Sequence, residues 1–296
     1  MTGARNARVA AFRAGFTVIE LMLAMVVTAL LGAALVRTMV SSNRFLGRVE
    51  SGREARGAAR AGINLAATEL RMVSAGTGIE AATAKSLTIR VPFRLGVACV
   101  STAGAPGSLV ATMLPADTTI ATTTLGYNGF AALESTGEYG YVNGGIDPVS
   151  SGVSQCTGSP ANLTVIPGST VLAMTGLLVP TAIAAGTPVV LWRRVRYEIA
   201  ASTVMPGRTA LWRRQINNAN IVLQSDEIAA PLDTASRFGF FINNSRVVSD
   251  TVPTALANIR GVELRFVGQS VRVASGATRA EQFRVLTSIF FLNRPD

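Results

Sequence analysis

One carboxylate lies inside an apolar stretch near the start of this chain, and its position has a clear chemical consequence. Between Arg13 and Arg37 the only charged side chain is that of Glu20. A carboxylate in hydrocarbon costs on the order of a few kcal/mol, so an acid at this place suggests a functional site that needs a partner. A protonated amine is the best partner, because in a low-dielectric setting the pair is favoured over either charge alone.

The other residue types leave few routes to catalysis. The chain has no histidine, which removes Ser-His-Asp and Cys-His mechanisms and argues against a zinc enzyme. We therefore predict no catalytic residue and no cofactor. Four acids of the middle region could include calcium ligands, but their spacing does not match an EF-hand loop and no metal site is predicted; they are Asp117, Glu134, Glu138 and Asp147.

The two cysteines, Cys99 and Cys156, lie outside any metal-type spacing. They would suit a disulfide in an oxidising compartment such as a periplasm. The alternative is a pair of buried free thiols, and the sequence leaves both open.

The segment Gly15-Phe16-Thr17-Val18-Ile19-Glu20-Leu21, which follows a short basic leader, resembles the processing signal of type IV prepilins and type II secretion pseudopilins. The resemblance covers about the first 40 residues. It implies that a membrane-embedded prepilin peptidase cleaves between Gly15 and Phe16 and methylates the new amine of Phe16. It also implies that Glu20 neutralises that amine on a neighbouring subunit.

The family resemblance carries further expectations about partners and location. It implies contacts with other major and minor pilin or pseudopilin subunits, with an inner-membrane assembly platform and with the lipid bilayer. The chain would be a single-pass inner-membrane protein with a periplasmic head before assembly, and part of an extracellular or periplasmic filament afterwards. Its function would be that of a minor subunit that primes or caps a pilus or pseudopilus.

The elements that position these residues are predicted from composition and periodicity. Hydrophobic residues make up 49% and charged residues 15% of the chain, so it is not a disordered sequence. No proline interrupts the chain before Pro92, and a long helix is expected from Phe16 to about Ser74. We divide the chain into a leader (residues 1–15), a transmembrane and assembly helix (16–36), the soluble half of that helix (37–74) and an α/β head (75–296). The head contains a variable insert at about residues 101–186.

The predicted fold is α+β, similar to type IV pilins, with the helix packed on a mainly antiparallel sheet. Alternating apolar residues predict strands, and Pro206-Gly207 predicts a turn between two of them; the segments are 87–91, 189–199, 210–216, 238–242, 262–267, 271–273 and 283–292. The repeated Leu-Trp-Arg-Arg at 191–194 and 211–214 is interpreted as a cross-strand pair. The insert is expected to be loops with short strands. The last strand resembles that of the PilW-like and GspJ-like minor subunits.

Three alternatives remain at this level. The apolar run could be an ordinary single-pass anchor or a removed signal peptide, although Gly15 precedes the apolar core instead of following it. A DNA-uptake subunit would bind phosphates through exposed Arg193, Arg194, Arg213 and Arg214, and the net charge of +10 permits nucleic acid, anionic lipid or acidic partners.

The arginines between Arg37 and Arg60 have two interpretations. They form either a stripe that faces other subunits or lipid headgroups, or a solvated helix face.

Overall fold

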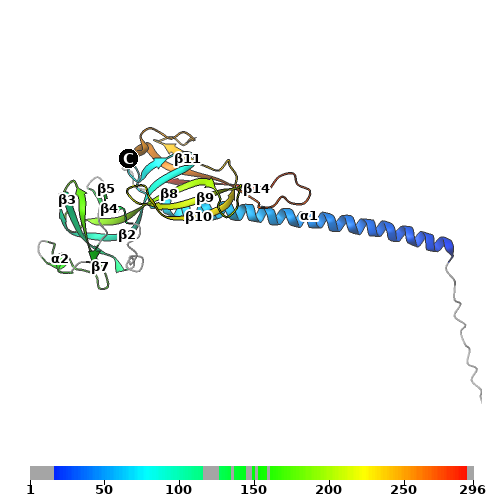
Figure 1. Cartoon of the computed structure of the whole chain (residues 1–296), viewed down its shortest axis with the longest axis horizontal. Helices are drawn as coiled ribbons and strands as arrows, with labels where there is room; N and C mark the ends of the chain where they lie inside the picture. Colours follow the sequence, from blue (N-terminus) through cyan, green and yellow to red (C-terminus); the bar gives the residue numbers. More distant parts are fainter. Residues whose placement is uncertain are drawn as a thin grey trace, which may run out of the picture.

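One long helix extends from a head built on a large antiparallel sheet, as the computed structural model shows (Figure 1). It describes residues 17–115, 127–134, 137–144, 149–150, 153–158 and 161–291. The chain therefore has the predicted α+β class. Gly15 and Phe16 lie outside the described residues.

The helix α1 spans Val18–Leu70. It ends four residues before the predicted end at Ser74, because the chain turns through residues 71–78. Gly76 adopts a φ of 76° in this turn, a left-handed conformation that glycine reaches without steric cost. The turn carries the chain from the helix into the first strand.

The strands form one 14-stranded sheet in which all pairs are antiparallel. Its main path runs β12-β11-β13-β10-β9-β8-β2-β3-β7-β6, with β1 on β2, β14 on β13, and β4 on β8 and β5. The strands are β1 (Ile79–Ala82), β2 (Ser86–Thr102), β3 (Gly104–Met113), β4 (Gly129–Leu133), β5 (Tyr139–Asn143), β6 (Val149–Ser150), β7 (Thr170–Val179), β8 (Pro188–Ala201), β9 (Thr209–Ile216), β10 (Val222–Leu232), β11 (Arg237–Ile242), β12 (Val248–Ser249), β13 (Ile259–Gln269) and β14 (Gln282–Phe290). Two short helices, α2 (Ser154–Thr157) and the 3-10 helix η2 (Leu256–Asn258), complete the described elements.

Two cores divide the head into two lobes that share the long strands β2 and β8. Leu87, Ile89, Val195 and Tyr197 from one end of these strands join the core beneath α1, which we call the helix-proximal lobe. The opposite ends of β2 and β8 pack with β3, β4, β5 and β7 around a second core, the distal lobe. Figure 1 shows the distal lobe beyond the proximal one, at the far end of the molecule from the start of α1.

The helix packs on the proximal sheet through small side chains. Its buried residues recur three or four positions apart, which places them on one face; they are Ser51, Ala55, Ala59, Gly62, Ile63, Ala66, Ala67, Glu69 and Leu70. A Cβ atom at Gly268 of β13 would lie 1.9 Å from the carbonyl oxygen of Ala55, so glycine is required for this close approach. Among the larger apolar side chains in the second half of the helix, Ile63 and Leu70 are buried, whereas Val40, Leu46, Val49 and Leu65 are exposed.

Most of the predicted strands are confirmed. The segments 87–91, 238–242 and 262–267 lie in β2, β11 and β13, and 189–199 pairs with 210–216 as β8 and β9. Of the predicted strand 283–292, residues 283–290 lie in β14 and Phe291 follows its end. Residues 271–273 form no strand and lie in the loop between β13 and β14, so that prediction is wrong.

The insert was predicted as loops with short strands, and for its described residues this is wrong in part. Strands β3 and β7 are ten residues long each and pair with one another along the distal lobe. Alternating Leu, Val, Ala and Met side chains bury one face of these strands, a pattern hidden in the sequence by the many Thr, Gly and Ser residues around it.

The two Leu-Trp-Arg-Arg copies lie on paired strands but do not face each other. Trp212 is opposite Glu198, and Arg194 is opposite Ile216. Trp192 is instead opposite Pro92 and Gly129. The strand register displaces the copy at 191–194 toward the distal lobe, so the two tryptophans contact different residues.

Candidate membrane and assembly segment

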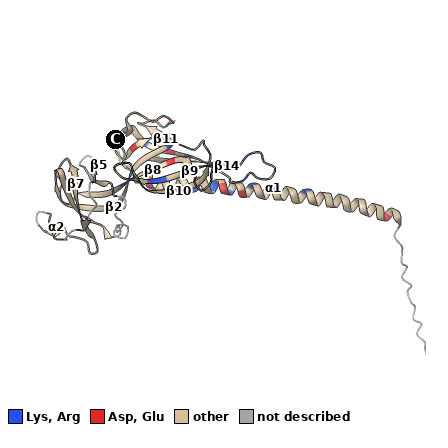
Figure 2. Ribbon diagram, viewed as in Figure 1, with Lys and Arg blue, Asp and Glu red and all other residues tan. Residues whose placement is uncertain are grey.

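The first half of α1 has no side chain buried against the head. From Val18 to Glu50 no described side chain is buried, and Ser51 is the first that is. This segment is apolar on all sides up to Val36, and Figure 2 shows it almost without charged residues. Among the described residues, α1 is the one helix long and apolar enough to cross a membrane. The structure thus gives the chain a single apolar helix near its start that could serve as an anchor.

Glu20 lies in the first turn of α1. Thr17 is the N-cap residue, and its Oγ1 atom accepts a hydrogen bond from the backbone N–H of Glu20 at 3.3 Å. The sequence Thr-x-x-Glu is the signature of a capping box, a signal that the sequence analysis did not use. Negative charge is also favoured here by the helix dipole. Glu20 is exposed and forms no ion pair with any residue that the structure describes.

The opposite end of α1 is joined to the sheet by a buried carboxylate that sequence reasoning missed. Glu69 accepts hydrogen bonds from Nη2 of Arg213 at 2.7 Å and from the hydroxyl of Tyr197 at 2.6 Å. Tyr197 and Arg213 are direct cross-strand neighbours on β8 and β9. Burial and the neighbouring carboxylate raise the pKa of Tyr197 above its usual value. Burial alone would lower the pKa of Arg213, but Glu69 raises it.

The four arginines proposed for DNA binding are not freely exposed. Arg213 binds Glu69, Arg194 binds Glu80 at 2.5 Å, and Arg214 binds Glu198 at 2.6 Å. The guanidinium of Arg193 stacks on the ring of Phe93 at 4.0 Å. All four are half-buried, so the exposure that the DNA-uptake alternative requires is only partial, because these arginines face acids and rings of their own head.

A second carboxylate, Glu80 of β1, binds two arginines at once. Its Oε1 atom lies 2.7 Å from Nε of Arg90, and its Oε2 atom binds Arg194. Arg90 also stacks on Tyr141 and Trp192, with ring centroids 4.8 and 5.1 Å from its guanidinium carbon. This cluster lies between the two lobes and connects β1, β2, β5 and β8.

Cys99 and Cys156 form a disulfide that links β2 to α2. The pairing that the sequence left open is therefore present in the structure. Both residues are buried with Val110, Ala161 and Val171 in a small cluster on the distal lobe. The bond holds the segment around α2 against the sheet.

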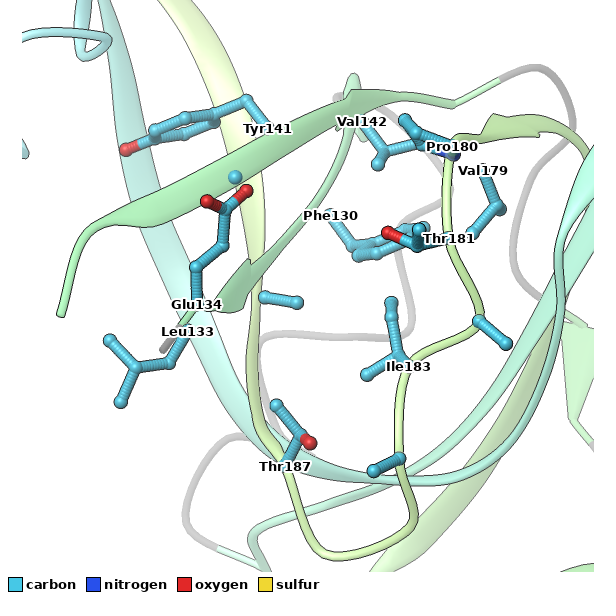
Figure 3. Close-up of a pocket in the computed structure, with 14 residues that line it drawn as sticks. Phe130, Leu133, Glu134, Tyr141, Val142, Val179, Pro180, Thr181, Ile183 and Thr187 are labelled. Carbon is cyan, nitrogen blue, oxygen red and sulfur yellow. The ribbon is translucent and has the colours of Figure 1, made fainter. Parts of the chain in front are cut away.

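The distal lobe has a pocket of about 430 Å³ between the β4–β5 hairpin and residues 179–187 (Figure 3). Its floor is apolar, with Phe130, Val142 and Ile183, and Thr181 and Thr187 add hydroxyl groups. Glu134 is the single acidic residue among those that line it. Figure 3 shows the Glu134 side chain on the same side as Tyr141, facing Val179 and Pro180 across Phe130.

The calcium candidates fall partly outside the described chain. Asp117 and Asp147 lie outside the described residues, whereas Glu134 and Glu138 flank the β4–β5 turn. No group of three His, Cys, Asp or Glu side chains within the described ranges is close enough to hold a metal ion.

Comparison with known proteins adds no relative. No protein-family model, no curated protein and no solved structure matches this chain.

Proposed function

We propose that this protein is a minor pilin or pseudopilin, a structural subunit that primes or caps a filament and has no catalytic role of its own. The observation that carries the proposal is the form of α1. From Val18 to Val36 it is apolar, exposed and charged only at Glu20, while from Ser51 onward one of its faces is buried against an antiparallel sheet. An exposed apolar helix surface of this length must be buried away from water. A bilayer would bury it first, and a bundle of similar helices would bury it after assembly.

The processing signal supports the same function. In the proposal, prepilin peptidase cleaves between Gly15 and Phe16, and α1 holds the head on the periplasmic side of the inner membrane. The helix then leaves the bilayer and packs among other subunits on the assembly platform. Glu20 sets the register by binding the methylated amine of Phe16 on a neighbouring subunit. The first turn of α1 presents this carboxylate to the outside of the helix.

The first experiment reads the N-terminus. Intact-mass spectrometry of the chain purified from membranes, with and without active prepilin peptidase, should give a chain that begins at Phe16 and carries one extra methyl group when the peptidase is present. A chain that still begins near Met1 with active peptidase would contradict the proposal and favour an ordinary single-pass anchor.

The second experiment separates the two roles open to Glu20. Glutamine suits the capping box as well as glutamate does, so Glu20→Gln keeps the cap and removes the charge. We expect this variant to be cleaved and anchored but absent from cross-links to other subunits. Glu50→Gln, an exposed acid on the same helix, is the matched control and should assemble. Normal assembly of Glu20→Gln would mean that the carboxylate only caps the helix.

A further inference from the structure

The loop between β13 and β14, residues 270–281, runs back along α1 toward its apolar half (Figure 1). At its base, the backbone N–H of Val271 donates a hydrogen bond to Glu54 at 3.3 Å. At its tip, a Cβ atom on Gly276 would lie 3.5 Å from Nε of Arg44. The loop tip therefore lies beside a part of the helix ten positions nearer to the N-terminus than its base.

Three arginines of α1 face the side on which this loop lies. Arg37, Arg44 and Arg48 are seven and four positions apart, so they share one helix face. Continuing by three and four positions, the same face reaches Ser51 and Ala55, which are buried against the head. The helix face that is buried against the head at Ser51 and Ala55 thus carries a row of arginines in the part of α1 that extends beyond the head.

The loop adds two more arginines, Arg272 and Arg279. We define the arginine collar as Arg37, Arg44, Arg48, Arg272 and Arg279; all five are exposed. Within the described chain none of them is in an ion pair, whereas six arginines of the head are. Three glutamates lie near the head side of the collar, Glu50, Glu54 and Glu281, and Glu54 already accepts a hydrogen bond from the loop.

The length of the free helix places the collar at a membrane surface. From Val18 to Glu50, α1 is about 50 Å long at roughly 1.5 Å per residue. The apolar part of this length, from Val18 to Val36, is about 28 Å long and matches the hydrocarbon core of about 30 Å, so Arg37 lies at the edge of that core. Arg44 and the loop tip beside it lie about 10 Å further along the helix, within reach of the headgroups.

We propose that the arginine collar binds the phosphates of anionic lipids and docks the head on the membrane surface. Guanidinium groups bind phosphate through paired N–H donors, and the five positive charges without ion-pair partners match an anionic surface. Docking fixes the tilt of α1 and the direction in which the head faces before any other subunit binds. The inference rests on the membrane-anchored helix of the proposed function but not on cleavage or assembly.

The test uses the full chain alone in vesicles, so a failure of cleavage or assembly cannot affect it. Ser275→Cys, next to Gly276 at the loop tip, carries an environment-sensitive fluorophore. Its emission is compared in phosphatidylcholine vesicles with and without phosphatidylglycerol. We expect a blue shift with phosphatidylglycerol that weakens as salt is added.

Charge variants decide between specific docking and a general charge effect. Arg272→Gln with Arg279→Gln should weaken docking roughly fivefold per arginine. Arg71→Gln with Arg246→Gln removes the same charge from exposed positions of the head and should leave the shift unchanged. An equal shift in both vesicle types, or an equal loss in both double variants, would overturn the proposal. Melting temperatures of the variants confirm that each is folded.

Discussion

Glu69 and Arg213 join the end of α1 to the middle of the sheet through a bidentate ion pair. Nε and Nη2 of Arg213 donate to the same carboxylate oxygen at 3.0 and 2.7 Å, and Nε also lies 3.2 Å from the second oxygen. The side chains of Glu69 and Arg213 are 12% and 15% exposed. The pair therefore fixes the helix on the sheet at the end opposite to the membrane segment.

Loss of one partner of this pair should be strongly destabilising. Arg213→Met leaves Glu69 buried without its cation, and we expect a loss of about 3 kcal/mol in the free energy of unfolding. Glu69→Leu combined with Arg213→Met should cost much less than the sum of the single changes. Arg214→Met is the control, because its pair with Glu198 is more exposed and should contribute about 1 kcal/mol or less. Urea denaturation of the two single variants, the double variant and the Arg214→Met control measures these losses. If the losses of the two single variants add up in the double variant, the two residues are not coupled.

Two glycines should respond to alanine in opposite directions. Gly268→Ala places a Cβ atom against the backbone of Ala55, so the helix must move and the melting temperature should fall by several degrees. Gly57→Ala, on α1 itself with no atom within 4 Å of its Cβ position, should stabilise the chain by about 0.5–1 kcal/mol. Similar melting temperatures for the two variants would mean that α1 does not pack on β13 as described.

Reduction of the disulfide should loosen the distal lobe. Cys99 and Cys156 are 57 positions apart, and closing a loop of this length stabilises a fold by about 4 kcal/mol in the chain-entropy account. We expect Cys99→Ala with Cys156→Ala to lower the melting temperature and to expose residues near α2 to hydrogen exchange. Protection of the helix-proximal lobe should change little, since its core is separate. Uniform loss of protection over both lobes would contradict this separation.

Alkaline pH should destabilise the fold through two tyrosines. Burial raises the pKa of Tyr141 to about 12 and that of Tyr197 further, from a usual value of 10.0. The folded chain thus keeps both protons where the unfolded chain loses them. This stabilisation is complete below about pH 10 and is lost as the pH rises through the folded values. Melting temperatures between pH 9 and 12 measure the loss.

A phenylalanine variant assigns part of this loss to one residue. Tyr197→Phe removes a hydrogen bond to Glu69 and should lower stability at neutral pH, but its stability should fall less steeply in alkali. Tyr139→Phe, at a half-buried position of β5, is the matched control. An unchanged alkaline slope in Tyr197→Phe would show that this hydroxyl is not the titrating group.

Local periodicity predicted the long helix and most of the longer strands, but not β3, β7 and β10. The apolar run with its single acid at Glu20 predicted the free half of α1, and the alternation at 195–199 predicted the buried face of β8. These predictions rest on neighbours along the chain, which share a helix face or a strand face at fixed spacing. The capping signal at Thr17 was readable by the same means.

The contacts that decide the candidate sites depend on the tertiary structure. Glu69 is 128 positions from Tyr197 and 144 from Arg213, and nothing in local spacing indicates that they meet. The same holds for the loop tip at Gly276, which lies beside Arg44 only because β13 and β14 pack against α1. The sequence alone determined an apolar helix with one carboxylate, followed by a β-rich head. Sheet register and helix packing decided which arginines bind carboxylates of the head and which lack ion-pair partners within the described chain, because these contacts join residues far apart along the chain.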